Sequence, residues 1–306
     1  MAVFLLKRVL SAIVTLFFVV TVTFFLMHAV PGGPFATNEK LGRNIVKAME
    51  VKYGLDKPLI QQYGIYLRNL VKGDLGLSIA SKEGKTVNYI IGQKFPVSAR
   101  LGIISIIMAL ILGLFMGCYA ALRHERFVDR FIMFISTLGI AVPGFIMGML
   151  LLLLFGVALR WLNFIGLNTP ADYILPTIAL AFYPACFIAR LIRSSLLDVL
   201  GQDYIRTARA KGIHAYMILF KHAMRNAILP VVTYMGPLIA YILVGSFVIE
   251  RIFSIPGLGL FFIQSITSRD YPLIMGTTIF LAVLIIFMNL VVDIVYVFID
   301  PRIKLK

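Results

Sequence analysis

Charged residues are scarce in this chain, and acidic residues are scarcer than basic ones. Of the 306 residues, 14% are charged and 60% are hydrophobic. A soluble domain of this size carries about 25% charged residues, so the composition excludes an ordinary soluble globular protein. Several apolar runs reach the ~20 residues that a helix needs to cross a bilayer. The sequence therefore predicts an all-α, polytopic membrane protein.

Motifs that carry chemistry are also missing. The chain has no GxxxxGK[ST] phosphate-binding loop and no HExxH motif. Its two cysteines, Cys118 and Cys186, lie in apolar runs and are expected to be small buried residues, not metal ligands or a disulfide framework. The four histidines are scattered, which is typical of structural residues. We therefore predict a chain that is not an enzyme and that binds no cofactor or metal itself.

The net charge of +15 raises the question of whether the chain binds nucleic acid. The distribution of the charge favours another explanation, because the basic residues cluster in short loops beside apolar spans, as the positive-inside rule describes. The partner that accounts for this charge is the lipid bilayer, and no nucleic acid is expected.

Six transmembrane spans are predicted, at about residues 9–30, 97–121, 131–159, 174–192, 229–249 and 273–299. Residues 1–30 form the first transmembrane helix, 31–96 an extracytoplasmic cap loop, and 97–306 the transmembrane core. In the cap, one helical face is predicted from the spacing of Leu59, Tyr63, Tyr66, Leu67 and Leu70.

Two features of the spans predict how the helices pack and bend. Prolines inside three spans weaken the helix where a path bends or opens; they are Pro143, Pro184 and Pro237. Two Gly-xxx-Gly pairs permit close helix approach; they are Gly113 with Gly117 and Gly144 with Gly148.

Six spans place both termini on one side of the membrane, and the positive-inside rule makes that side cytoplasmic. The predicted inner side carries fifteen basic residues: Lys7, Arg8, Arg123, Arg126, Arg130, Arg190, Arg193, Arg206, Arg209, Lys211, Lys221, Arg225, Arg302, Lys304 and Lys306. The two short outer loops carry three, namely Arg160, Arg251 and Arg269.

Asp293 is the only carboxylate well inside a predicted span. Such a residue is a candidate for proton coupling in a carrier. The favoured interpretation is that Asp293 caps or pairs with a basic residue such as Arg190 or Arg193.

The segment Asp203–Pro230 is a basic, amphipathic stretch between two very apolar spans. Residues 204–211 have the composition of a short helix, and Gly212 permits a sharp turn. After the turn, helical spacing predicts a stripe of Tyr216, Leu219, Phe220 and Met224. These residues alone leave two interpretations open: an amphipathic helix on the lipid headgroups, or a docking site for a cytoplasmic partner.

The stretch YIRTARAKG, residues 204–212, resembles the coupling loop of importer-type ABC permeases, the EAA–Gly motif. Arg206-Thr207-Ala208 stands where Glu-Ala-Ala would, and Gly212 is the motif glycine. The arginine and the longer spacing from Gly212 to Pro230 depart from the general motif. Both departures are usual in the oligopeptide/dipeptide/nickel branch of OppB/DppB type.

Other segments resemble the same branch in order along nearly the whole chain, most closely the OppB type. They are KRVLSAIVTLFFVVTVTFFLMHAVPGGPF at the start, YGLDKP (Tyr53–Pro58), GDLGLS (Gly73–Ser78), GSFVIERIFSIPGLG (Gly245–Gly259), RDYP (Arg269–Pro272) and DPR (Asp300–Arg302).

The resemblance implies a type I ABC importer permease of MetI-like fold in the bacterial cytoplasmic (inner) membrane, multi-pass, with both termini cytoplasmic. It implies a permease subunit that translocates oligopeptides or dipeptides into the cytoplasm. Its implied partners are a second homologous permease subunit (OppC/DppC-like), two ABC ATPase subunits (OppD/OppF-like) that bind ATP and Mg, and an extracytoplasmic peptide-binding protein.

The resemblance also implies roles for particular residues. Coupling to the ATPase is expected of Tyr204, Arg206, Thr207, Ala208, Arg209, Lys211 and Gly212, in the cytoplasmic loop 203–228. Docking of the binding protein is expected of Tyr53, Asp74, Glu250, Pro256, Gly257, Arg269 and Asp270, in the outer segments 53–78 and 250–272.

Three alternatives stay open. A permease of the same family for nickel or another small solute has the same motifs. An ion-driven secondary carrier works without an ATPase and is sensitive to Asp293→Asn. A membrane scaffold recruits a partner through the basic loop and moves no substrate.

Overall fold

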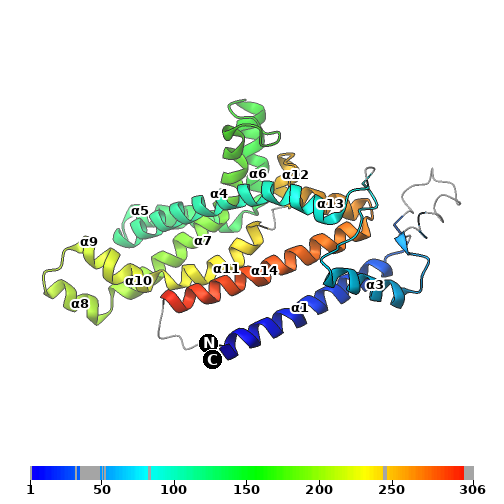
Figure 1. The fold of residues 1–306 in the computed structure, drawn as a ribbon. Helices are drawn as coiled ribbons and strands as arrows, with labels where there is room; N and C mark the ends of the chain where they lie inside the picture. Colours follow the sequence, from blue (N-terminus) through cyan, green and yellow to red (C-terminus); the bar gives the residue numbers. More distant parts are fainter. Residues whose placement is uncertain are drawn as a thin grey trace. The chain divides into compact units, whose positions relative to one another are not determined.

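The computed structural model describes residues 2–31, 33–34, 49, 51, 53–81, 84–243 and 247–299 (Figure 1). Within these residues the regular elements are helices, and an isolated antiparallel bridge pairs Leu77 with Thr86. The predicted all-α class is confirmed. The DPR segment at 300–302 and residues 245–246 of the GSFVIERIFSIPGLG segment lie outside the described residues.

Five helices in the described part of the chain are long and apolar enough to cross a membrane: Lys7–Ala29, Val87–Leu122, Pro170–Leu200, Leu229–Ile252 and Tyr271–Val291. A bent pair of helices, Phe127–Ala141 and Gly144–Ala158, makes the sixth span if both are counted as one. The helix at Val87 begins ten residues before the predicted span at 97.

The third span differs from the single tilted helix predicted at 131–159. It consists of α5 (Phe127–Ala141) and α6 (Gly144–Leu151), and α6 continues as a π-helical segment, Leu152–Ala158. The two halves meet at 101°. Val142, with φ −86° and ψ 119°, is extended, because the ring of Pro143 disfavours helical geometry in the preceding residue. Pro143 therefore ends the helix.

The chain divides into two compact units, residues 1–97 with 256–286 and residues 98–255 with 287–306. The first unit contains α1 (Ala2–Ala29), α3 (Leu59–Val71), the start of α4 (Val87–Leu122), α13 (Leu258–Thr267) and the start of α14 (Tyr271–Ile299). Its core includes Val20, Phe24 and Ile279. The helix α3 packs against this core through Tyr63, Tyr66, Leu67 and Leu70, as predicted, while Leu59 is exposed.

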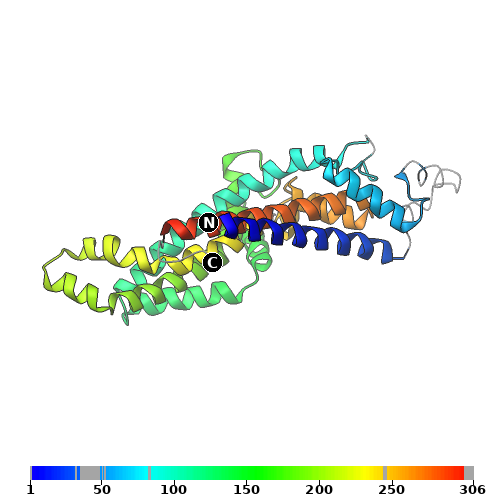
Figure 2. The ribbon, with the colours of Figure 1, turned by 60° about the horizontal axis from the view of Figure 1, so that its bottom comes forward.

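The second unit is built around α7 (Ile174–Leu200), which packs against α5, α6 and α11 (Leu229–Leu243). It also contains α8 (Asp203–Ala210), α9 (Ala215–Met217), a π-helical segment Ile218–Ala223, α10 (Met224–Ala227) and α12 (Phe247–Ile252). Figures 1 and 2 show α8 and α9 at one end of this unit and α6 at the other. Pro184 and Pro237 lie inside α7 and α11 without ending them.

Glycines bring α4 close to α7 in the second unit. A Cβ atom on Gly113 would lie 2.7 Å from Cβ of Ile188, and one on Gly117 would overlap Ile192 and the carbonyl of Ala189. Contacts this short do not occur between real atoms, so any larger residue would force the helices apart. The predicted close approach at this Gly-xxx-Gly pair is confirmed.

In the second Gly-xxx-Gly pair, only one of the two glycines is closely packed. A Cβ atom on Gly148 would lie 2.7 Å from Cδ1 of Ile249, while one on Gly144 would meet nothing closer than 3.9 Å. A third glycine, Gly139 of α5, faces the Sγ atom of Cys186 with no room for a Cβ atom. Cys186 is buried, as predicted, and packs as a small apolar residue.

Candidate functional site

The basic loop folds into a helix, a turn and a second helical segment. In the first, α8, Ile205 and Ala208 are buried, whereas Arg206 and Arg209 are exposed. Asp203 occupies the first turn and Arg209 the last, where each charge is favourable to the helix dipole. The helix is therefore amphipathic, with its small apolar face turned to the protein and its basic face to the outside.

Gly212 ends α8 in a left-handed conformation, with φ +72°. Its N–H donates to the carbonyl of Arg209 at 2.9 Å, and the N–H of Ile213 donates to the carbonyl of Ala208 at 3.2 Å. These two hydrogen bonds form a Schellman cap. A Cβ atom on Gly212 would have no neighbour within 4 Å. Glycine is thus favoured here by backbone conformation and not by lack of space.

The second helical segment, residues 215–227, carries the predicted stripe on one side. Tyr216, Leu219, Phe220 and Met224 all line one cavity of about 580 Å³, and the ring centroids of Tyr216 and Phe220 lie 4.5 Å apart. Leu219 is buried and Met224 half-buried, whereas Tyr216 and Phe220 are exposed. The stripe is therefore only partly covered by the rest of the second unit.

The exposed side of the loop carries five cations, which we call the basic face: Arg206, Arg209, Lys211, Lys221 and Arg225. Tyr204 and Thr207 are also exposed, and the Tyr204 hydroxyl accepts a hydrogen bond from Asn226 at 2.9 Å. Ala208 differs from the other predicted coupling residues, because it is buried against the chain's own core and does not belong to the basic face.

One apolar core connects this loop to the spans of the second unit. Ile205 and Ala208 of α8 belong to the same cluster as Ile192 and Leu196 of α7 and Val231 of α11. The cluster continues along α11 to Ile242. The three helices α7, α8 and α11 therefore share one close-packed core.

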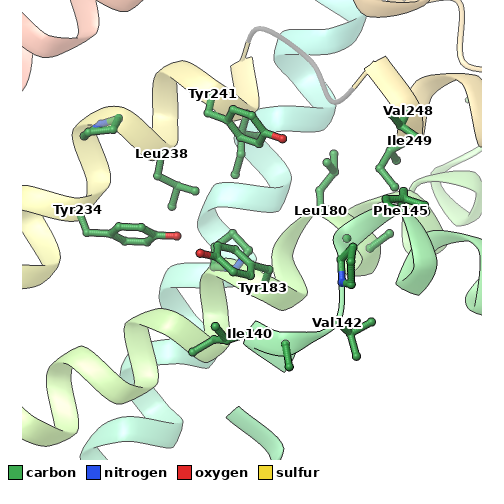
Figure 3. A pocket seen from close by; sticks show the side chains of 17 residues that line it. Ile140, Val142, Phe145, Leu180, Tyr183, Tyr234, Leu238, Tyr241, Val248 and Ile249 are labelled. Carbon is green, nitrogen blue, oxygen red and sulfur yellow. The ribbon is translucent and has the colours of Figure 1, made fainter. Parts of the chain in front are cut away.

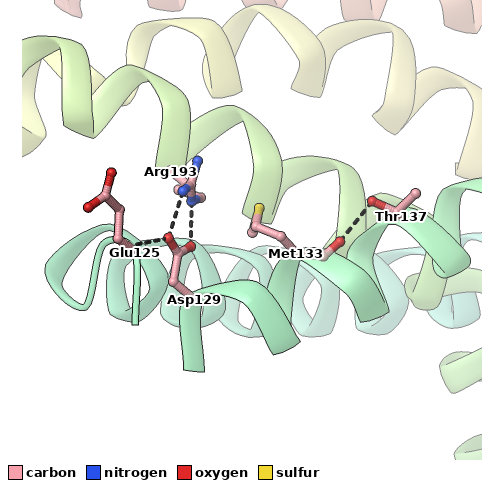
Figure 4. Close-up of polar contacts among 5 residues, drawn as sticks. All are labelled: Glu125, Asp129, Met133, Thr137 and Arg193. Atoms are coloured by element: carbon pink, nitrogen blue, oxygen red, sulfur yellow. Dashed lines mark hydrogen bonds and ion pairs between the residues drawn. The ribbon is translucent and has the colours of Figure 1, made fainter. Parts of the chain in front are cut away.

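An ion pair that we did not predict joins α5 to α7 (Figure 4). Arg193 Nε and Nη2 donate to the two carboxylate oxygens of Asp129 at 2.6 and 2.7 Å, and the N–H of Glu125 adds a third hydrogen bond at 3.0 Å. The suggested pairing of Arg193 with Asp293 is therefore wrong for this arginine. In the sequence Asp129 lies among basic residues, and nothing there indicates that its partner is an arginine 64 positions away.

Asp270, a predicted docking residue, is buried in the first unit. Its carboxylate accepts hydrogen bonds from the Ser78 hydroxyl at 2.5 Å and from the N–H groups of Ile79, Ala80 and Leu273 at 3.0–3.2 Å. Four hydrogen bonds to one buried carboxylate hold residues 78–80 against the start of α14. Asp270 thus shapes the outer segments and offers no carboxylate to a partner in this structure.

Glu250 of the second unit is also buried, and its carboxylate accepts a hydrogen bond from Ser98 at 2.6 Å. Like Asp270, it offers no carboxylate to a partner in this structure. Gly257 is buried as well.

The remaining predicted docking residues reach the surface of the first unit. Asp74 and Pro256 are exposed, and Tyr53 and Arg269 are half-buried. Arg269 donates to the carbonyl of Pro31 at 2.8 Å. Burial, and then the charge of Asp270, raise the pKa of Tyr53 above that of a free tyrosine.

A cavity of about 620 Å³ opens where the third span breaks (Figure 3). Its 17 lining residues come from both sides of the break, from α7, from α11 and from α12. All three prolines singled out in the sequence line it, namely Pro143, Pro184 and Pro237. Three tyrosines line it as well: Tyr183, Tyr234 and Tyr241. In the described part of the chain, no group of three or more His, Cys, Asp or Glu is arranged to hold a metal ion.

Comparison with known proteins gives consistent matches over the whole length. A family model described as the binding-protein-dependent transport system inner membrane component matches residues 109–305, and the corresponding N-terminal model matches residues 1–102. The dipeptide transport system permease protein DppB of Bacillus subtilis (strain 168) is 48% identical over 307 residues, covering 100% of this chain and 99% of that protein. The oligopeptide transport system permease protein OppB of Haemophilus influenzae is 42% identical over 303 residues, covering 98% and 99%.

A solved structure shares the fold. The inward-facing methionine ABC transporter MetNI aligns with a TM-score of 0.55 at 18% identity, covering 69% of this chain and 97% of the matched chain. The arrangement of helices in this chain is thus similar to that of an ABC importer permease.

Proposed function

The chain belongs to the family of binding-protein-dependent transport system inner membrane components, in its oligopeptide and dipeptide permease branch, and from this premise we propose that it moves short peptides into the cytoplasm through a membrane-spanning, ATP-driven importer. The observation that carries the proposal is the exposed basic face of α8, on a helix whose opposite face is packed into the spans. The chain is a transport component and not a catalyst.

The basic face is the contact for an ATPase subunit. Its five cations are exposed. They would attract acidic groups on a partner's surface and orient the partner. Two such ATPase subunits, with ATP and Mg, supply the free energy, and a second homologous permease completes the membrane path. In this arrangement the basic face and both termini are cytoplasmic.

Coupling follows from the packing of α8. Closure of the ATPase pair displaces α8, and the shared apolar core transmits the displacement to α7 and α11. Both helices line the cavity at the break of the third span. The cavity is thereby opened to one side of the membrane and then to the other.

A binding protein delivers the peptide on the outer side. Asp74 and Pro256 are the exposed predicted contacts, and Tyr53 and Arg269 are partly accessible beside them in the first unit. The role of Asp270 is to hold residues 78–80 in place through its four hydrogen bonds.

Site-directed cross-linking tests the ATPase contact. In a background with Cys118 and Cys186 replaced by alanine, Arg209→Cys and Ala208→Cys place a thiol on opposite faces of α8. In the assembled transporter, a short bifunctional maleimide should join Arg209→Cys, but not Ala208→Cys, to the ATPase subunit. Equal cross-linking of both, or cross-linking of neither in an active complex, would contradict the proposal.

The turn at Gly212 provides a second test. A side chain here has space but must adopt φ +72°, which costs about 1–2 kcal/mol for most residues and less for asparagine. Gly212→Val should abolish peptide uptake while the complex still assembles, and Gly212→Asn should retain most of it. Normal uptake by Gly212→Val would remove this turn from the coupling path.

A further inference from the structure

The cavity at the break of the third span has an unusual lining. Tyr183 projects from α7, and Tyr234 and Tyr241 lie seven residues apart, on one side of α11 (Figure 3). The ring of Phe187 packs against Tyr234 with centroids 4.4 Å apart, which holds the phenol in place. None of the three hydroxyls hydrogen-bonds to another described residue.

Charge is missing from this lining. Among the 17 residues that line the cavity, none is Lys, Arg, His, Asp or Glu. The other lining side chains are aliphatic, proline, phenylalanine, alanine or glycine. The hydroxyls of the three tyrosines are therefore the polar side-chain groups of the cavity, and each can both donate and accept a hydrogen bond.

Proline adds a main-chain acceptor. Pro184 has no N–H to donate to the carbonyl four residues earlier in α7, which is that of Leu180. Leu180 also lines the cavity. A carbonyl that lacks its helical donor can accept a hydrogen bond from another donor, and a peptide N–H group is one.

These observations match the chemistry common to all peptides. Side chains differ between peptides, but every peptide has main-chain N–H and C=O groups at regular spacing. A cavity of 620 Å³ is within the range of about 300–1,000 Å³ found for ligand sites. A charge on the wall would favour peptides of opposite charge, and this wall has none.

We propose that this cavity is a main-chain recognition site for peptides in transit, in which Tyr183, Tyr234 and Tyr241 hydrogen-bond the peptide backbone and the uncharged wall tolerates side chains of either charge. The inference rests on the proposed function and extends it, because it assigns the residues that contact the substrate and the part of the substrate that they recognise.

The first test removes the hydroxyls. The assembled transporter is reconstituted in liposomes, and uptake of radiolabelled trialanine is measured together with ATP hydrolysis. The triple variant Tyr183→Phe, Tyr234→Phe, Tyr241→Phe should lower uptake by about tenfold or more, because three hydrogen bonds are lost together, while ATP hydrolysis stimulated by loaded binding protein persists. The matched control is Tyr119→Phe, because Tyr119 is 40% exposed, close to the 39% of Tyr183, and lies outside the cavity.

The second test adds a charge. Val248 lines the cavity and is 46% exposed, so a charged residue fits there with little effect on packing. Wild type should import Ala-Lys-Ala and Ala-Glu-Ala at similar rates when each saturates the binding protein. Val248→Asp should favour the lysine peptide, and Val248→Lys the glutamate peptide, each by about tenfold.

The outcomes separate this inference from the proposed function. Failure of wild type to import any peptide would overturn the proposed function. Wild-type uptake that is unchanged in the triple phenylalanine variant, or an unchanged peptide preference in both Val248 variants, would overturn the inference and leave the importer intact.

Discussion

Replacing Asp129 by asparagine should destabilise the second unit by about 2–4 kcal/mol. The side chain of Asp129 is 3% exposed and that of Arg193 is 24% exposed, and the two make a bidentate contact. Breaking a fully buried pair costs about 3–5 kcal/mol, and the partial exposure of the arginine reduces that cost. At roughly 2–4 °C per kcal/mol for a domain of this size, Tm should fall by about 4–16 °C.

The assay is thermal unfolding of the purified chain in detergent, with a double-mutant cycle. Asp129→Asn and Arg193→Gln should each lower Tm, because each leaves one charge of the pair without its partner. The double variant removes both charges and should be no worse than the poorer single variant. The exposed pair Asp203 and Arg206, with side chains 96% and 74% exposed, is the control, and Asp203→Asn should leave Tm unchanged. Equal shifts at both pairs, or additive losses in the double variant, would refute the reasoning.

Three further predictions concern packing and hydrogen bonding. The Tyr66 hydroxyl is buried without a partner among the described residues, so Tyr66→Phe should keep or raise Tm. Tyr63→Phe loses a 2.6 Å hydrogen bond to Thr21 and should lower Tm. The opposite order of the two variants in a melting experiment would contradict this prediction. Gly117→Val should separate α4 from α7 and prevent recovery of folded protein, and a normal yield of stable chain would count against the close contact. Asp270→Asn should free residues 78–80 and speed proteolysis there, and an unchanged cleavage rate would show that the hydrogen bonds do not restrain this segment.

Local chemistry explains what the sequence could predict. Gly212 was recognisable because a basic helix must turn sharply before the next span, and its φ of +72° agrees. Pro143, Pro184 and Pro237 marked the region of the cavity because proline weakens a helix wherever it occurs. Each of these inferences depends on a residue and its immediate neighbours.

Features that depend on tertiary packing were not predictable. The pairing of Asp129 with Arg193 joins residues from two helices, and the burial of Glu250 and Asp270 depends on contacts with residues far away in the sequence. Both acidic residues were predicted as docking contacts because the resemblance places them in the outer segments, and a resemblance does not show which side chains are buried. Helical spacing correctly placed Tyr216, Leu219, Phe220 and Met224 on one side of their segment, but spacing alone could not show that Tyr216 and Phe220 remain exposed.

The most direct test of the central claim is peptide uptake by the reconstituted assembly, with ATP hydrolysis measured in the same liposomes. The account predicts that binding protein loaded with a short peptide stimulates hydrolysis, and that peptide accumulates inside only when ATP is present. Accumulation driven by an ion gradient without ATP, and lost in Asp293→Asn, would contradict the account and identify a secondary carrier.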